Sequence, residues 1–492
     1  MSTYKRTPEW NVVIRRPDYS KICLGSSDQV LYKRVSEWSK NGVPTDKLRF
    51  VSSESLAGGA FEYTDLIGYE YDNSLKNVSN PFSLTITPAQ DKVGLSWKDK
   101  IKSSDVVFIS EFGKLRFIGI VGGTSYSMNL NNENPNRSVT ISGTSFGGKL
   151  ESFNIPMNIY LWYTLGTTAD QKNTAFMAAL NSKVSEKQSL KDIFTSIKDG
   201  FFEVAFGANQ DGFLSLMTRY FQLDIDNLVA FYPLNLKPYQ RDSNTLWSIF
   251  RQILPEPVYE IFGRFEKGKY HLICRETPFD AREWGELTIT TLNPLYLLEQ
   301  NLNDSDDEVY THYFSQLPNS AFSQNEIYAN QSLSDVSIFD KDKLKIYGYR
   351  QLQANFPFYD IDKGREFNSQ DFLKKNSARM YAWYTNNVDF QSGTITMMTV
   401  PEGENNEYIN IGERIKYLEG AASSIEFYVE GVTRKMTYPQ TMTSKYSVTR
   451  GYEYGLKSVK IEGITLGTPQ VKKISQLGRK LLQAEQDITG RT

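Results

Sequence analysis

Short segments in which apolar and polar residues alternate recur in the first third of this 492-residue chain. They comprise residues 81–87 (PFSLTIT), 106–109, 115–121 and 138–142. A period of two places successive side chains on opposite faces of a β-strand, so each segment predicts a strand with one buried face. Residues 111–113 (EFG) fit a tight hairpin connection between two of these strands. Short strands at this spacing favour a sandwich or barrel over units in which strands alternate with helices.

A second group of alternating segments lies towards the other end of the chain. It comprises residues 394–399, 408–411, 425–433 and 444–450, with glycines between the segments. No fixed-period sequence repeat connects this group with the first. We nevertheless expect the two β blocks to be structurally related, because both combine short alternating strands with glycine-containing turns.

The region between the two β blocks has a different periodicity. Residues 167–182 are rich in alanine, and apolar residues recur at helical spacing over residues 189–201. Residues 245–254 predict a short helix that ends before Pro255, and residues 270–275 predict a strand. This region is therefore expected to contain helices first and mixed structure after them.

The end of the chain carries an amphipathic pattern. Thr468 and Pro469 are suited to begin a helix, and an apolar stripe runs from Val471 to Leu481 with lysines and arginines on the opposite face. This predicts a short helix that either docks on a partner or packs on its own domain.

Together these patterns predict a mainly β protein with α+β insertions, in which two antiparallel β domains, each a sandwich or a barrel, are accompanied by helical and mixed domains. The expected divisions are a first β domain (1–155), a helical insertion (156–225), a mixed α+β middle domain (226–392), a second β domain (393–466) and a C-terminal amphipathic helix (467–492).

The charge balance argues against a general binder of polyanions. The net charge is −2, with 55 Lys and Arg against 57 Asp and Glu, whereas phosphate binding needs a basic surplus or patch. Residues 1–10 lack the apolar core of a signal peptide, and no stretch is apolar enough to span a membrane. We therefore expect synthesis in the cytoplasm, no membrane span and no recognition of a specific nucleic-acid sequence.

Residues that could carry catalysis are few. The chain has two histidines, His271 and His312, and neither stands at zinc-site spacing or beside a nucleophile motif. Cys23 and Cys274 are too far apart in sequence to indicate a disulfide framework, and both are expected to be buried thiols.

Acidic and glycine-rich segments give weaker signals. Residues 304–308 (DSDDE) are typical of a solvated loop, and residues 224–227 (DIDN) lack the glycine and the terminal glutamate of a calcium loop. The glycine pairs at 58–59, 122–123 and 147–148 lack the lysine of a phosphate-binding loop and predict turns. The sequence therefore predicts no catalytic, cofactor-binding or metal-binding residue.

A series of phrases, in order along the chain, resembles the baseplate hub proteins of contractile phage tails and related injection systems (the late control protein D family). The phrases are residues 81–87, 105–109 (DVVFI), 116–121 (RFIGIV), 136–143 (NRSVTISG), 259–262 (YEIF), 272–279 (LICRETPF), 309–314 (VYTHYF), 346–351 (IYGYRQ), 411–415 (IGERI), 427–432 (FYVEGV) and 447–451 (SVTRG). Thr311 stands where family members commonly have asparagine. Residues 156–224 and those after 466 have no counterpart in this resemblance.

The resemblance implies a structural, non-enzymatic virion protein without a cofactor. Its β-barrels would be similar to those of the tail tube, and three copies would adapt a hexameric tail tube to a trimeric central spike while lining the channel. The implied partners are the tail tube protein, the central spike protein and the baseplate wedge proteins, with the tape measure protein as a further candidate. The implied location is the baseplate of a virion tail or an injection particle.

Two other functions remain open. A cell-wall-glycan hydrolase or glycan-binding protein fits the aromatic content of 13% and the acidic runs, because the spacing of two catalytic carboxylates cannot be read from sequence. A distal tail hub of a non-contractile phage is the other alternative. Neighbouring genes for tube, sheath and spike proteins would favour the contractile hub, and the absence of sheath and wedge genes would favour the distal hub.

Overall fold

Antiparallel strands form most of the secondary structure in the computed structural model, which confirms the mainly β prediction. The structure describes residues 10–15, 21–25, 66–86, 101, 103–112, 114–129, 136–152, 194–195, 198, 213–225, 245–278, 281–304, 308–316, 337–356, 369–385, 387, 390–399, 408–419, 423–437, 441–452, 454–461 and 464–471. All structural statements that follow concern these residues.

The first group of alternating segments forms a five-stranded antiparallel unit, which we call the first β unit. Its strands are β3 (Leu66–Ser74), β4 (Pro81–Ile86), β5 (Val106–Glu111), β6 (Lys114–Asn129) and β7 (Asn136–Ser145). They lie in the order β3-β4-β7-β6-β5. Phe82, Leu84 and Ile86 of β4 are buried, as the alternation of this segment predicts. Beyond β5 the sheet continues into β1 (Trp10–Arg15) and β2 (Lys21–Gly25).

The second group forms another five-stranded antiparallel unit, the second β unit. Its strands are β12 (Leu297–Asp304), β16 (Gln391–Met398), β17 (Arg414–Glu419), β18 (Ser423–Thr437) and β19 (Thr441–Tyr452). They lie in the order β12-β16-β19-β18-β17, and the short strand β11 (Ile289–Thr291) adds to β17 in parallel. The unit thus takes β11 and β12 from the stretch that the sequence patterns assigned to the middle region.

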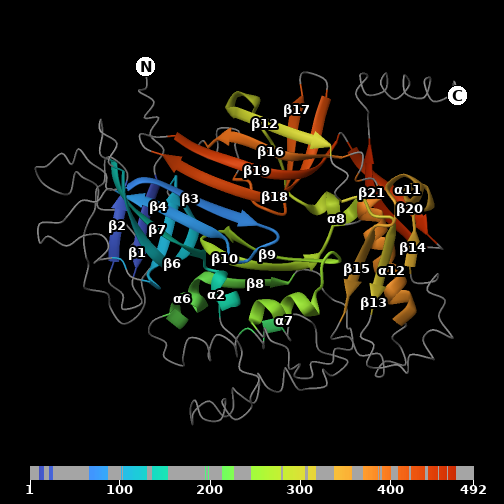
Figure 1. Cartoon of the computed structure of the whole chain (residues 1–492), viewed down its shortest axis with the longest axis horizontal. Helices are drawn as coiled ribbons and strands as arrows, with labels where there is room; N and C mark the ends of the chain where they lie inside the picture. Colours follow the sequence, from blue (N-terminus) through green and yellow to red (C-terminus); the bar gives the residue numbers. More distant parts are fainter. Residues whose placement is uncertain are drawn as a thin grey trace, which may run out of the picture.

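The two units are joined edge to edge. β3 of the first unit pairs antiparallel with β18 of the second, from Gly68 opposite Thr437 to Ser74 opposite Gly431. This pairing, which we call the seam, merges both units into one thirteen-stranded sheet. Figure 1 shows the red and orange strands β18 and β19 alongside the blue strand β3.

The two units repeat one topology. Matched in chain order, β3, β4, β5, β6 and β7 correspond to β12, β16, β17, β18 and β19, and each set has the same neighbours. The bulge in β3 lies between Leu66 and Gly68, and the bulge in β12 lies at the matching place between Leu297 and Glu299. β-bulges are specific, retained features of a strand rather than irregularities.

The long strands β6 and β18 share a second bulge. It lies between Val121 and Gly123 in β6 and between Val429 and Gly431 in β18. With these bulges superposed, the part of β6 from residue 123 to 129 corresponds to the part of β18 from residue 431 to 437. The strands β5 and β17 also match, because they pair with β6 and β18 at the same distance from the bulge. Val106 of β5 pairs with Ile120, the residue before the bulge in β6, and Arg414 of β17 pairs with Tyr428, the residue before the bulge in β18.

A left-handed residue precedes the matching strands β5 and β17. Ser104 has φ 72° and Gly412 has φ 73°. The amide of Ser104 donates to Val121 O at 2.8 Å, and that of Gly412 donates to Val429 O at 2.9 Å. Four features of the backbone, namely strand order, two bulges and one left-handed turn, therefore coincide. The sequence patterns suggested this relationship without detecting a repeat.

The expected closure of each β unit into a barrel is not seen among the described residues. None of the described pairings joins the first strand of a unit to its last, because β3 continues into β18 while β5 continues into β1. The units are open sheets merged side by side in this part of the chain.

A three-stranded sheet lies between the cores of the two units. It consists of β8 (Phe221–Ile225), β9 (Tyr259–Glu266) and β10 (Lys269–Glu276). Tyr270 and Leu272 of β10 belong to the core that contains the first unit, whereas Ile273, together with Phe262 of β9, belongs to the core of the second unit. Because neighbouring residues of a strand point to opposite faces, this small sheet packs against both units.

Three short helices lie below the small sheet in Figure 1: α2 (Gly148–Ser152), α6 (Phe213–Tyr220) and α7 (Leu246–Ile253). The predicted helix at 245–254 is confirmed, with Thr245 as its N-cap accepting from Ser248 N at 3.1 Å. In the predicted helical insertion, residues 194–195 and 198 and α6 are helical, while β8 is a strand; its other residues lie outside the described part.

The remaining elements gather at the right of Figure 1. They are α8 (Ala281–Glu286), β13 (His312–Gln316), β14 (Ser337–Phe339), α11 (Lys341–Tyr347), β15 (Gln351–Asn355), α12 (Ser369–Tyr384), β20 (Tyr454–Ile461) and β21 (Ile464–Val471). The 3-10 turn η3 (Pro294–Tyr296) directly precedes β12. β14, β13 and β15 form one small sheet, and β20 and β21 form a hairpin.

Two local predictions are wrong. Residues 408–411 are not a strand: Ile409 and Ile411 are buried, but so is Asn410 between them, and carbonyl oxygens of this loop accept from arginines instead of from a neighbouring strand. The helix expected to begin at Thr468 does not, because residues 464–471 pair with β20. Residues 472–492 of that predicted helix lie outside the described residues.

We expect Gly143→Ala in β7 to lower the free energy of unfolding by about 2 kcal/mol, as overpacking of a dense core does. A Cβ at this position would lie 2.0 Å from Ile120 O and 2.7 Å from Cε1 of Phe82. Chemical denaturation of the full chain measures the effect. Gly123→Ala, on the partner strand β6, is the matched control because its Cβ would meet nothing within 4 Å. Equal losses from both substitutions would show that close approach at Gly143 does not matter.

Candidate functional site

The two histidines occupy different sheets and do not form a common site. In β10, His271 Nδ1 lies 2.5 Å from Asp224 Oδ2, and its Nε2 lies 3.0 Å from Glu266 O. In β13, the His312 ring stacks on Phe339 at 4.0 Å between centroids, and burial lowers its pKa. Both histidines therefore join neighbouring strands within their own sheets.

The other residues singled out in the sequence have structural partners as well. Cys274 is a buried free thiol, as predicted, and burial raises its pKa, which disfavours the reactive thiolate. Cys23 lies in β2, and its side chain is outside the described part. Of the acidic run, Asp304 ends β12, and the carboxylate of Glu308 accepts from Asn387 Nδ2 at 3.3 Å.

Within the described residues, no group of three or more His, Cys, Asp or Glu side chains is arranged to hold a metal ion. Among the same residues, no helix has both the length and the apolar character needed to cross a membrane. The arrangement that remains as a candidate functional site is the seam and the polar contacts that fix it.

A buried charge cluster lies at the seam. Arg434 of β18 lies opposite Tyr71 of β3 and is 3% exposed. Its Nη1 lies 3.8 Å from Oε2 of Glu111, the last residue of β5. The hydroxyls of Tyr69 and Tyr71 donate to Glu111 Oε1 at 3.0 and 3.1 Å. Burial and the Glu111 carboxylate raise the pKa of both phenols, which keeps them protonated as donors.

A tyrosine between two guanidinium groups completes this cluster. The ring centroid of Tyr408 lies 3.7 Å from Cζ of Arg116 and 3.9 Å from Cζ of Arg434. Arg116 belongs to the first unit and Arg434 to the second, so cation–π contacts join the two units through one ring. This explains why the 408–411 loop is buried although it is not part of a strand.

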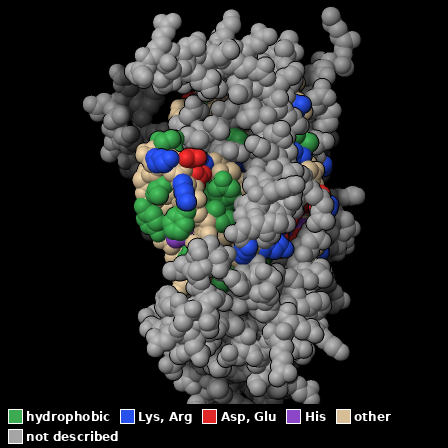
Figure 2. Space-filling model, turned by 90° about the vertical axis from the view of Figure 1, so that its right-hand side faces the viewer, with side chains coloured by type: hydrophobic (Ala, Val, Ile, Leu, Met, Phe, Trp, Pro, Cys, Tyr) green, Lys and Arg blue, Asp and Glu red, His purple; other side chains and the backbone are tan. Residues whose placement is uncertain are grey.

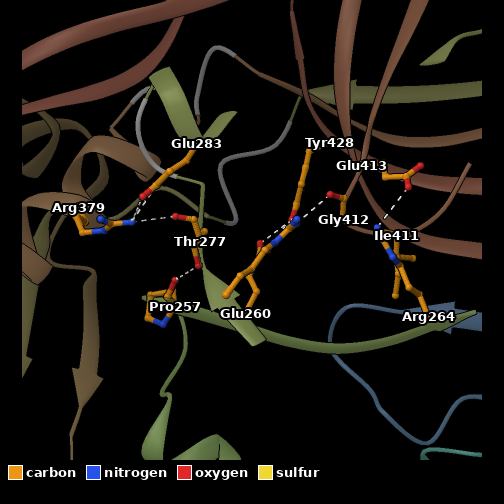
Figure 3. A network of polar contacts seen from close by, with 11 residues as sticks. Pro257, Glu260, Arg264, Thr277, Glu283, Arg379, Ile411, Gly412, Glu413 and Tyr428 are labelled. Carbon is orange, nitrogen blue, oxygen red and sulfur yellow. Dashed lines mark hydrogen bonds and ion pairs between the residues drawn. The ribbon is translucent and has the colours of Figure 1, made fainter. Parts of the chain in front are cut away.

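A second polar network fixes the small sheet to the second unit (Figure 3). Arg275 of β10 donates to Glu260 at 2.9 Å, to Gly412 O at 2.9 Å and to the Tyr428 hydroxyl at 2.8 Å. The Tyr428 hydroxyl donates in turn to Glu260 at 2.7 Å. Because each buried charge has a partner of opposite charge or a polar acceptor, the network avoids the penalty of an unpaired buried ion.

The same face of β9 carries a further ion pair to the turn before β17. Arg264 Nη1 lies 3.3 Å from Glu413 Oε1 and donates to Ile411 O at 3.4 Å. Burial raises the pKa of Glu413, although the Arg264 charge opposes that shift. The left-handed turn that is common to both units is thus held by β9 and β10 in the second unit.

Helix α12 is attached to this network at the left of Figure 3. Arg379 of α12 is 5% exposed, and its Nη2 donates to Glu283 Oε2 at 3.0 Å and to Thr277 O at 3.2 Å. Cζ of Arg450, in β19, lies 3.7 Å from the ring centroid of Trp383, which also belongs to α12. The elements at the right of Figure 1 are therefore anchored to the second unit through α12.

An exposed apolar surface lies on the outer side of these elements. Phe339, Ile346 and Tyr349 are 47%, 74% and 62% exposed, and α11 between them has no buried residue. Figure 2 looks at this end of the molecule and shows hydrophobic side chains gathered beside basic and acidic groups. Mixed surfaces of this kind are typical of protein contacts.

Chemically, the buried clusters bind parts of one chain together and offer no arranged nucleophile, acid and base. Sequence reasoning did not identify them, since their members come from segments hundreds of residues apart. The one sequence signal was Tyr408, which lies in an alternating segment, but the alternation was interpreted as a strand.

Comparison with known proteins gives distant structural similarities. No family model matches the chain, and no curated protein matches it. A tail protein from Neisseria meningitidis has 11% identity and a TM-score of 0.42 over 80% of this chain and 94% of its own. The 43 kDa tail protein of a Shewanella oneidensis prophage has 12% identity and a TM-score of 0.44 over 79% and 96%.

An E. coli component of the type VI secretion system, described as structurally similar to bacteriophage T4 tail proteins, has 10% identity and a TM-score of 0.39 over 79% of this chain and 74% of its own. Because each of these TM-scores is below 0.5, we take no function from the similarities.

We expect Glu111→Gln to lower the free energy of unfolding by about 3 kcal/mol, because it leaves the buried Arg434 guanidinium without its carboxylate. Glutamine retains an oxygen that can accept from Tyr69 and Tyr71, so the substitution tests the charge and not the space. Equilibrium denaturation of the full chain measures the loss.

Glu70→Gln is the matched control on the same seam. Glu70 pairs with Lys435 at 3.5 Å, but their side chains are 44% and 58% exposed, and exposed pairs contribute about 1 kcal/mol or less. A loss from Glu111→Gln no larger than that of the control would contradict a stabilising role for the buried pair.

Proposed function

We propose that this chain is the structural baseplate hub of a contractile tail or injection machine, a homotrimer that adapts a hexameric tail tube to a trimeric spike. The observation that carries the proposal is the duplicated β unit: one chain contains two units of the same topology, joined edge to edge by the seam. Three such chains present six similar units, which matches the symmetry of a six-subunit tube above and a three-chain spike below.

The buried clusters support this function because an adaptor must hold its two units in a fixed relation. Arg434, Glu111 and Tyr408 fix the seam, and the network of Arg275 and Glu260 fixes the small sheet against the second unit. In the proposed assembly the merged sheets surround the channel and contact the tube protein. The exposed apolar surface at α11 is the part assigned to the spike or wedge proteins.

The domain division is part of the proposal. The two β units take the places of the two tube-like barrel domains, and the stretch between them supplies the small sheet and the helices. The location in a virion or particle baseplate, and the tape measure protein as a further partner, follow from the same assignment.

A reconstruction of the assembled particle tests the hub function. We expect three copies of the chain around the channel, with both β units of each copy facing it and six units forming one ring. Six copies in the ring, or a second β unit that lies away from the channel, would contradict the adaptor.

We also propose that the chain catalyses no hydrolysis, since its histidines and buried carboxylates are engaged in structural contacts. Purified full chain is expected to give no clearing on a peptidoglycan zymogram, with lysozyme as positive control. Clearing that is lost on substitution of a single acidic residue would instead favour the glycan hydrolase.

A further inference from the structure

In each β unit, one long strand has an edge without a described partner. β12 is the outermost strand of the second unit and pairs with β16 alone among the described strands. In β6, pairing with β5 ends at Ile120, so residues 123–129 pair with β7 on one side and with no described strand on the other. Open edges of this length invite pairing with another strand.

These two edges are the counterparts of the two strands that form the seam. β6 corresponds to β18 and β12 corresponds to β3, as the shared strand order and bulges establish. Within the chain, residues 431–437 of β18 pair with residues 68–74 of β3. The same relation applied to the unpaired edges places residues 124–129 of β6 opposite residues 299–304 of β12.

We propose that β6 of one copy pairs antiparallel with β12 of a second copy, with Thr124 opposite Asp304, Ser125 opposite Asn303 and Asn129 opposite Glu299. This inference rests on the proposed function, in which copies of the chain form a closed ring. We assign a second copy of the chain to each edge because the strand that matches β6, namely β12, belongs to the other β unit of the same chain. A second copy therefore brings the matching strand with it.

The side chains of the proposed register are compatible with pairing. Within the chain, Thr433 donates to Asp72 across the seam, and the corresponding pair, Ser125 and Asn303, again sets a hydroxyl against a side-chain carbonyl. The acidic residues of β12, Glu299 and Asp304, stand opposite uncharged residues, so no like charges face each other.

The exposed side chains of β12 agree with a covered edge. Leu298, which directly precedes the proposed register in β12, is 52% exposed, and Asn303 of β12 and Ser125 of β6 are exposed as well. An apolar residue at an unprotected strand edge promotes aggregation unless a partner covers it. Pairing with β6 of a second copy would cover this edge.

The pairing is heterologous, because each copy contributes a β6 edge on one side and a β12 edge on the other. Such contacts form rings if the rotation between copies closes. The resulting ring alternates two kinds of joint: the seam within each chain and its counterpart between chains.

Disulfide trapping tests the register. We would introduce Ser125→Cys and Asn303→Cys into full chain that carries Cys23→Ser, and oxidise it under native conditions. Paired residues in an antiparallel sheet have Cα atoms about 4.5–5.5 Å apart, within disulfide reach. The expected result is a shift of the chain to species of two and three chain masses on non-reducing gels.

Two matched pairs accompany this variant. Ser125→Cys with Asn301→Cys places the second thiol two residues out of register on the same strand, beyond the distance a disulfide spans. Thr433→Cys with Asp72→Cys is the positive control, since these residues pair within the chain and should form an intrachain disulfide without a change of mass.

The mass of the wild-type chain in solution is measured by light scattering alongside the cross-linking. The cross-linking tests the register, and the mass tests the ring on which the proposed function depends. Selective cross-linking of the 125–303 pair supports the inference. A trimer in which the 125–303 pair links no better than the 125–301 pair overturns the register and leaves the hub standing. A wild-type chain that is monomeric at all concentrations contradicts the ring, and the hub function with it.

Discussion

Backbone hydrogen bonds between β3 and β18 join residues that lie more than 350 positions apart in the chain, from Gly68 opposite Thr437 to Ser74 opposite Gly431. Closing such a long loop costs conformational entropy, so backbone pairing alone is a weak means of holding two units together. Burial of Arg434 beside Glu111 makes any other register costly, since a slip by one residue would turn the Arg434 side chain to the opposite face, away from this carboxylate. The position of one β unit relative to the other therefore depends on this joint.

The duplicated unit shows which parts of a β fold are retained when side chains differ. Both β units keep the same bulge, which ends at Gly123 in the first and at Gly431 in the second, and the same left-handed turn, at Ser104 and at Gly412. The side chains around these features differ because their surroundings differ: the small sheet places Arg275 against the turn at Gly412. Bulges and turns set the course of the strands, so they persist while packing is adjusted on each side.

Sequence periodicity predicted the strands whose two faces have different surroundings, such as β4, and the capped helix α7. It failed at residues 408–411, where alternation reflects burial of a loop whose carbonyls are bound by arginines, and at Thr468, where strand pairing overrides local helix signals. It did not identify α12 or the buried clusters. Arg379 and its partners come from distant segments, and no local pattern indicates which distant residues will meet.

The strands next to β5 and β17 differ between the two units, and this difference would give the proposed ring threefold rather than sixfold symmetry. β5 of the first unit continues antiparallel into β1 and β2, whereas on its outer side β17 of the second unit pairs, among the described strands, with the parallel strand β11 alone. In addition, the contacts of Arg264 and Arg275 fix the small sheet to the turn of the second unit. In the proposed ring, strand pairing would therefore be similar at all six joints while the surfaces beyond the strands alternate. An adaptor needs this combination, because a tube can bind six similar units while a spike recognises only the features that occur three times.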